Sequence, residues 1–175
     1  ALAVARISRD TAPEQSFAQQ RLWFLAQLEP DSSAYHLCGQ LSLSGALDDF
    51  ALQRSFDDLA ARHESLRTTF AIDANEVLVQ RIHPAQPVVI QQHDLSLHAQ
   101  PLEALGELAK AAVEQPMDLQ TGPLWRVLNV RLAPGQQQLV LVLHHIVADG
   151  WSVQVMLKEF AALYTAYAKG EVPSL

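Results

Sequence analysis

The run of consecutive apolar residues from Leu139 to Leu143 constrains the fold more than any other part of this sequence. Because successive side chains of a β-strand point to opposite faces, an unbroken apolar run predicts a strand that is covered on both sides. A second strand-like segment at 124–132, separated from it by the turn at 133–135, predicts a paired neighbour. The chain should therefore fold around a sheet with packed layers on both faces.

Four segments show the apolar spacing of amphipathic helices. The first follows Ser16, which forms with Gln19 the S-x-x-Q pattern of a capping box. The second follows Asp48, a good N-cap, the third begins at Pro101 and the fourth follows Gly150. Further strands are predicted over residues 37–43, 66–72, 77–82 and 88–93. This irregular order predicts an α/β (α+β) sandwich, a mixed β-sheet flanked by about four helices.

Composition and charge exclude several functions. The chain has 19 acidic and 12 basic residues and a net charge of -7, which disfavours a nucleic-acid binder or a polybasic membrane anchor. No apolar stretch approaches the roughly 18 residues that span a bilayer. Cys38 is the only cysteine, which excludes an internal disulfide and fits a reducing cytoplasm. We therefore expect a cytoplasmic protein without nucleic-acid or membrane partners.

The transition from the apolar strand into the last helix carries the candidate site. His144 and His145 stand where the strand ends, and strand geometry predicts that their rings point to opposite sides. Asp149 and Gly150 stand where the helix begins, and Asp149 by itself is more typical of a helix N-cap than of a catalytic acid. These local groups are too few for a closed metal site, and no glycine-rich phosphate loop is present, so we expect no bound metal or cofactor.

Three motifs in order give the chain a family resemblance. Residues 144–152, HHIVADGWS, are similar to the HHxxxDG signature shared by condensation domains of nonribosomal peptide synthetases and chloramphenicol acetyltransferases. Residues 16–25, SFAQQRLWFL, and 62–70, RHESLRTTF, match the first and second motifs of condensation domains. The resemblance implies a chloramphenicol acetyltransferase-like N-terminal lobe.

The resemblance also implies a domain organisation. Members of the family have two such lobes, with the active site in a tunnel between them. We expect residues 1–10 to be a linker or leading strand, 11–170 the N-terminal lobe, and 171–175 the start of a linker to a missing C-terminal lobe. The isolated lobe should then be inactive. Its expected partners are that C-terminal lobe and the upstream donor and downstream acceptor carrier domains, whose phosphopantetheine arms deliver the substrates.

By resemblance, His145 is the catalytic residue and faces the tunnel, where a neutral imidazole can accept a proton or hold the acceptor amine. The reaction implied is amide bond formation between a donor acyl or peptidyl thioester and an acceptor aminoacyl thioester. His144, Asp149 and Gly150 should support the loop, and Asp149 should form an ion pair with Arg62 or Arg67 of the second motif; the sequence does not choose between them. The remaining candidates are the possible tunnel-wall residues Trp151, which could instead lie in the core, and Ser152.

Three alternative functions stay open at this stage. An epimerisation domain uses the same histidine motif, although Trp151 and Ser152 after Gly150 and the intact second motif resemble condensation more closely. A free-standing acyltransferase of the chloramphenicol type is disfavoured by the first two motifs. A non-catalytic module that only docks carrier proteins is the third alternative.

Overall fold

The computed structural model describes residue 8 and residues 11–175, so the predicted linker or leading strand at 1–10 lies, apart from Ser8, outside the described residues. The described part contains four α-helices, one 3₁₀ turn and six strands. In chain order they are α1 (Phe17–Leu28), β1 (His36–Ser44), α2 (Asp49–Arg62), η1 (Glu64–Arg67), β2 (Thr68–Ile72), β3 (Leu78–Ile82), β4 (Ile90–Asp94), α3 (Pro101–Glu114), β5 (Trp125–Ala133), β6 (Gln136–His144) and α4 (Gly150–Ala168).

The main sheet has four strands in the order β1-β6-β5-β4. β6 pairs antiparallel with both β1 and β5, whereas β4 runs parallel to β5, so the sheet is mixed, as the sequence predicts. β2 and β3 form a separate antiparallel pair. The register places His36 opposite His144 at one end of the β1–β6 pair, a pairing that the site depends on.

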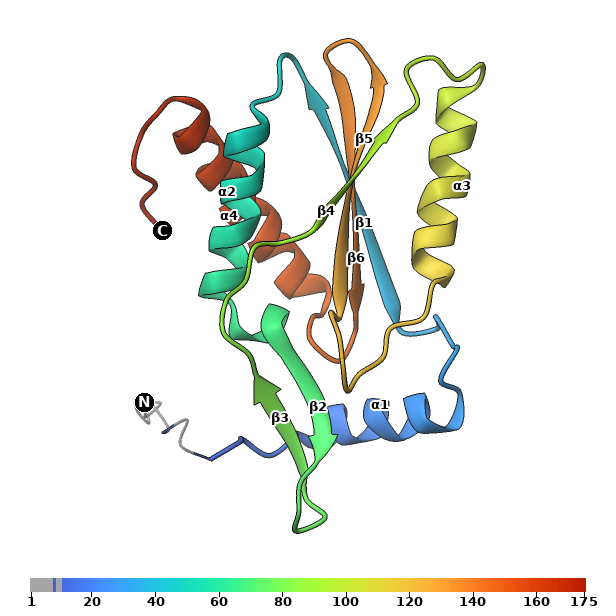
Figure 1. Ribbon diagram of the computed structural model, residues 1–175, viewed down its shortest axis with the longest axis vertical. Coiled ribbons are helices and arrows are strands. Elements are labelled where there is room, and N and C mark those ends of the chain that lie inside the picture. Colours follow the sequence, from blue (N-terminus) through green and yellow to red (C-terminus); the bar gives the residue numbers. More distant parts are fainter. Residues whose placement is uncertain (1–7, 9–10) are drawn as a thin grey trace.

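Helices cover both faces of the sheet (Figure 1). Along β6, Leu139, Leu141 and Leu143 pack into a core with α2 and α4, whereas Val140 and Val142 pack into a second core with α3 and α1. All of these side chains are buried. The apolar run is therefore a strand covered on both faces, as predicted, and the α/β sandwich is confirmed.

Local capping chemistry sets the helix starts. Ser16 and Gln19 form the complete capping box at α1, since each side chain accepts a hydrogen bond from the other residue's backbone N–H. Asp48 caps α2 by accepting a hydrogen bond from the N–H of Ala51 at 2.9 Å. No helix of the described residues is long and apolar enough to cross a membrane.

Two predicted strands begin later than their apolar content suggests. In the segment 66–72 the strand starts only at Thr68, because Leu66 and Arg67 belong to the 3₁₀ turn η1. The hydroxyl of Thr68 donates to the carbonyl of Glu64 at 2.7 Å at the end of this turn. In the segment 88–93 the strand starts at Ile90. The side chains of Asp57 and Gln53 on α2 bind the backbone N–H and carbonyl of Val88, which removes both groups from the sheet.

Candidate functional site

The two motif histidines lie on opposite sides of the end of β6. His144 is 4% exposed and faces the core with α3, whereas His145 is exposed. The backbone N–H of His145 donates to the carbonyl of Tyr35 at 2.8 Å and so extends the pairing with β1 by one residue. The strand period therefore predicts correctly that one ring packs into the fold while the other faces outward.

His145 opens into a cavity of about 590 Å³. The cavity lies between the start of α1, the residue before β1 and the loop that leads into α4. Its wall comprises Ser16, Ala18, Gln19, Arg21, Leu22, Tyr35, His145, Ile146, Val147, Ala148, Asp149 and Ser152. The ring nitrogens of His145 form no hydrogen bond with any other described residue, and the exposed imidazole lines the cavity.

The loop beneath His145 is held from two sides. The Nδ1 atom of His144 accepts a hydrogen bond from the N–H of Ile146 at 3.1 Å, and the carbonyl of His144 accepts one from Val147 at 3.1 Å. From α1, the amide nitrogen of Gln19 donates to the carbonyl of Ile146 at 3.5 Å. Burial, with smaller contributions from two neighbouring histidines, lowers the pKa of His144 to about 4, so this ring is neutral at physiological pH.

Asp149 caps α4, and its predicted ion pair with Arg62 or Arg67 is wrong. Its carboxylate accepts hydrogen bonds from the N–H of Ser152 at 2.7 Å and from the Ser152 hydroxyl at 2.6 Å, and these bonds hold its pKa below the ordinary value. Arg62 instead pairs with Glu159 at 3.3 Å, and Arg67 donates to the carbonyl of His83 at 2.6 Å. The helix start satisfies the carboxylate locally, so no distant cation is needed.

Replacement of Asp149 should therefore act through the cap. We expect Asp149→Ala to lower the thermal midpoint of the complete domain by a few degrees, because the N–H of Ser152 loses its acceptor. Asp149→Asn keeps an oxygen in the same place and should retain most of the midpoint. Thermal unfolding followed by circular dichroism measures both. An asparagine variant as unstable as the alanine variant would show that the charge matters more than the cap.

The remaining three candidate residues of this motif, Gly150, Trp151 and Ser152, lie at the surface of the described structure. Trp151 is 76% exposed, which excludes the core position that the sequence leaves open. It lines a smaller cavity of about 190 Å³ together with His63 and Met156. Ser152 lines both this cavity and the one around His145. A Cβ added at Gly150 would meet no atom within 4 Å, so packing in the described residues does not require glycine there.

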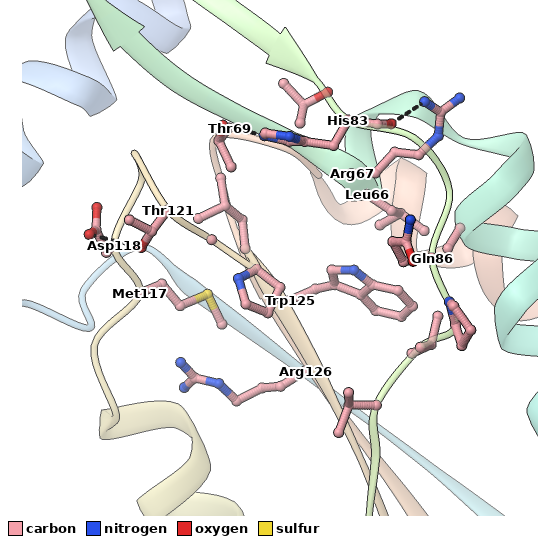
Figure 2. Close-up of a pocket in the computed structure, with 18 of the residues that line it drawn as sticks. Leu66, Arg67, Thr69, His83, Gln86, Met117, Asp118, Thr121, Trp125 and Arg126 are labelled. Atoms are coloured by element: carbon pink, nitrogen blue, oxygen red, sulfur yellow. Dashed lines mark hydrogen bonds between the residues drawn. The ribbon is translucent and has the colours of Figure 1, made fainter.

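A second cavity of about 590 Å³ lies beside the second motif (Figure 2). Trp125 occupies its middle, with Arg67 and His83 on one side and Arg126 on the other. Both guanidinium groups are bound to backbone carbonyls, Arg67 to that of His83 and Arg126 to those of the segment 112–116. The two arginines of this cavity are thus already hydrogen-bonded to backbone carbonyls of the protein. His145 does not line this cavity.

Two residues beside His145 differ in how far the sequence predicts their place in the site. Gln19 belongs to the first motif, and its capping role is predictable, but its bond to the carbonyl of Ile146 is not. Tyr35 lies in no motif, and only the register between β1 and β6 brings it to His145. Among the described residues, no group of three or more His, Cys, Asp or Glu side chains is placed to hold a metal ion.

Comparison with known proteins gives consistent matches. The family model "Condensation domain" matches residues 10–175. Chondramide synthase of Chondromyces crocatus is 46% identical over 155 residues, which cover 87% of this chain and 4% of that protein. A component of the linear gramicidin synthase of Brevibacillus parabrevis is 44% identical over 171 residues, which cover 97% of this chain and 2% of that protein.

Solved structures show the same likeness. The starter condensation domain of rhizomide synthetase superposes with a TM-score of 0.88 at 26% identity. The first condensation domain of the calcium-dependent antibiotic synthetase superposes with a TM-score of 0.87 at 25% identity. Each match covers 95% of this chain but 40% of the solved chain. The chain thus spans about two fifths of the solved chains and a few per cent of the synthases.

Proposed function

Because the chain belongs to the condensation-domain family, we propose that it supplies the N-terminal part of an active site for amide bond formation in nonribosomal peptide synthesis. The observation that carries the proposal is the position of His145. Its exposed imidazole has no hydrogen-bond partner among the described residues and opens into a cavity of about 590 Å³. A buried ring in that place could not meet a substrate amine.

The proposed reaction joins an acceptor amine to a donor thioester. The amine nitrogen attacks the thioester carbonyl carbon, the C–N bond forms, the C–S bond breaks, and the proton lost by the amine ends on the released thiol. An imidazole ring with a free nitrogen lone pair can accept a proton or a hydrogen bond, so the ring of His145 can take that proton or hold the amine. Placing the two substrates side by side supplies a further part of the acceleration.

The rest of the proposed machinery lies outside this chain. The cavity is open on one side, and the chain covers 40% of the solved condensation-domain chains, so a C-terminal lobe is proposed as the opposite wall. Donor and acceptor carrier domains are the proposed partners, and their phosphopantetheine arms bring the thioesters to His145. The tether then belongs to the substrate, and no resident cofactor is required. We propose Trp151 and Ser152 as residues of the tunnel wall.

The test compares this lobe with the complete domain. The complete domain, mixed with a carrier loaded with a donor acyl group and a carrier loaded with an acceptor amino acid, should transfer the acyl group and form an amide detectable by mass spectrometry. Residues 11–175 alone should form none, because half of the site is missing. An inverted α-carbon in place of the amide would favour epimerisation, and binding without any product would favour a docking module. Amide formed by the lobe alone would contradict the need for a second wall.

A further inference from the structure

A side chain outside the three sequence motifs contacts the buried motif histidine, His144. His36 is the first residue of β1, and the register places it opposite His144. The two rings meet edge to face, with their centroids 5.5 Å apart and their planes at 69°. The preceding residue, Tyr35, accepts the backbone N–H of His145. Two consecutive residues at the start of β1, Tyr35 just before the strand and His36 as its first residue, therefore hold both motif histidines, one through the backbone and one through a ring.

The other side of the His36 ring is held by α3. Its Nδ1 atom lies 2.6 Å from the carbonyl oxygen of Val113. A carbonyl only accepts hydrogen bonds, so Nδ1 must carry the hydrogen. Val113 stands in the last turn of α3, where carbonyl groups have no partner within the helix. The bond therefore satisfies an unpaired carbonyl and fixes both the orientation and the tautomer of the His36 ring. Figure 1 shows that β1 begins beside this end of α3.

The surroundings of the two rings favour the neutral form of each. Burial lowers the pKa of His36 and the pKa of His144, and the nearby Arg126 and His145 disfavour a positive charge there as well. The Nδ1 atom of His144 accepts the N–H of Ile146, so its own hydrogen lies on Nε2. The hydrogen bonds thus define one tautomer for each ring. A connected series of contacts then runs from the end of α3 through His36 and His144 to the loop that carries His145.

We propose that His36 is a positioning residue for amide formation. Its ring holds the ring of His144 in position beside α3. His144 in turn holds the loop that presents His145 to the substrate. His36 does not line the cavity around His145, so it acts through His144 and touches no reacting atom. This inference rests on the proposed function, because its consequence is a slower amide-forming step.

The experiment compares substitutions of His36 in the complete domain. His36→Leu keeps apolar bulk but removes the donor to Val113, whereas His36→Asn places an amide N–H close to the position of Nδ1. At saturating loaded carriers, we expect the single-turnover rate per folded molecule to fall roughly tenfold or more in the leucine variant, since small displacements of reacting groups are costly. The asparagine variant should recover most of that loss. The carrier concentration for half-maximal rate should stay unchanged in both.

Arg126→Leu is the matched control. Arg126 binds the same end of α3 through the carbonyls of Ala112, Gln115 and Pro116 and donates no hydrogen bond to His144. It should lower the thermal midpoint and leave the rate per folded molecule unchanged. A loss of rate in Arg126→Leu equal to that in His36→Leu, or no recovery in His36→Asn, would show that only the stability of the end of α3 matters. Either result would overturn the proposal.

Two further outcomes separate this inference from the proposed function. If the parent domain forms amide and His36→Leu does so at the same rate, only the positioning role fails. If the parent domain forms no amide with any loaded carriers, the proposed function fails and this inference fails with it. Should His36→Leu not fold, His36→Gln replaces it, because its longer amide reaches the Nε2 position and not the carbonyl of Val113. The glutamine variant should then be slow while the asparagine variant is fast.

Discussion

Replacement of His145 by alanine in the complete domain should slow amide formation by about 10²–10⁴-fold, the usual contribution of a general acid–base group. The side chain is exposed and its ring has no hydrogen-bond partner among the described residues, so the thermal midpoint should remain near that of the parent. Loaded carriers should still bind. Single-turnover product formation, normalised to the folded fraction, measures the effect.

A histidine on another surface provides the control. His98 is exposed and lines a different cavity, beside the start of α3, so His98→Ala should leave the rate unchanged. If His145→Ala condenses at close to the parent rate, the tunnel and the carriers position the substrates sufficiently by themselves. The assignment of His145 as the catalytic residue would then be wrong.

His144 should make the fold sensitive to acid. Its pKa is about 4 in the folded protein against 6.5 for an unperturbed histidine, so the unfolded chain binds a proton more readily than the folded one. The contribution of His144 to the unfolding free energy is therefore fully present above pH 6.5 and is lost as the pH falls from 6.5 towards 4. A shift of this size corresponds to about 2–3 kcal/mol of unfolding free energy between pH 7.5 and 4.5.

His144→Asn isolates this contribution. Asparagine keeps an acceptor for the N–H of Ile146 and does not titrate. The unfolding free energy of this variant should therefore fall by about 2–3 kcal/mol less than that of the parent between pH 7.5 and 4.5. Urea unfolding at both pH values, with His98→Asn as an exposed control that keeps the parent's pH dependence, measures the difference. Equal acid losses in parent and His144→Asn would show that His144 is not the group responsible. The neighbouring His36, whose pKa is also lowered, would then be the next candidate, since its effect has the same sign.

Several features of the fold are predictable because they depend on neighbours in the sequence. Helix starts follow from short-range caps, as Ser16 with Gln19 and Asp48 with Ala51 demonstrate. The central strand follows from the apolar run at 139–143. Strand starts are less predictable: a side chain of α2 takes the N–H of Val88 away from the sheet, and nothing around residue 88 signals this.

The sequence by itself determined the α/β layers, the capped start of α4 and the opposite directions of His144 and His145. These follow from the periods of strand and helix and from one aspartate close in the sequence to the amide that it caps. Only the tertiary structure decided which groups meet across long separations: Arg62 with Glu159, the carbonyl of Tyr35 with His145, and His36 with both Val113 and His144. The physical reason is that such contacts depend on strand register and helix packing, which bring together residues many tens of positions apart and leave no local pattern in the chain.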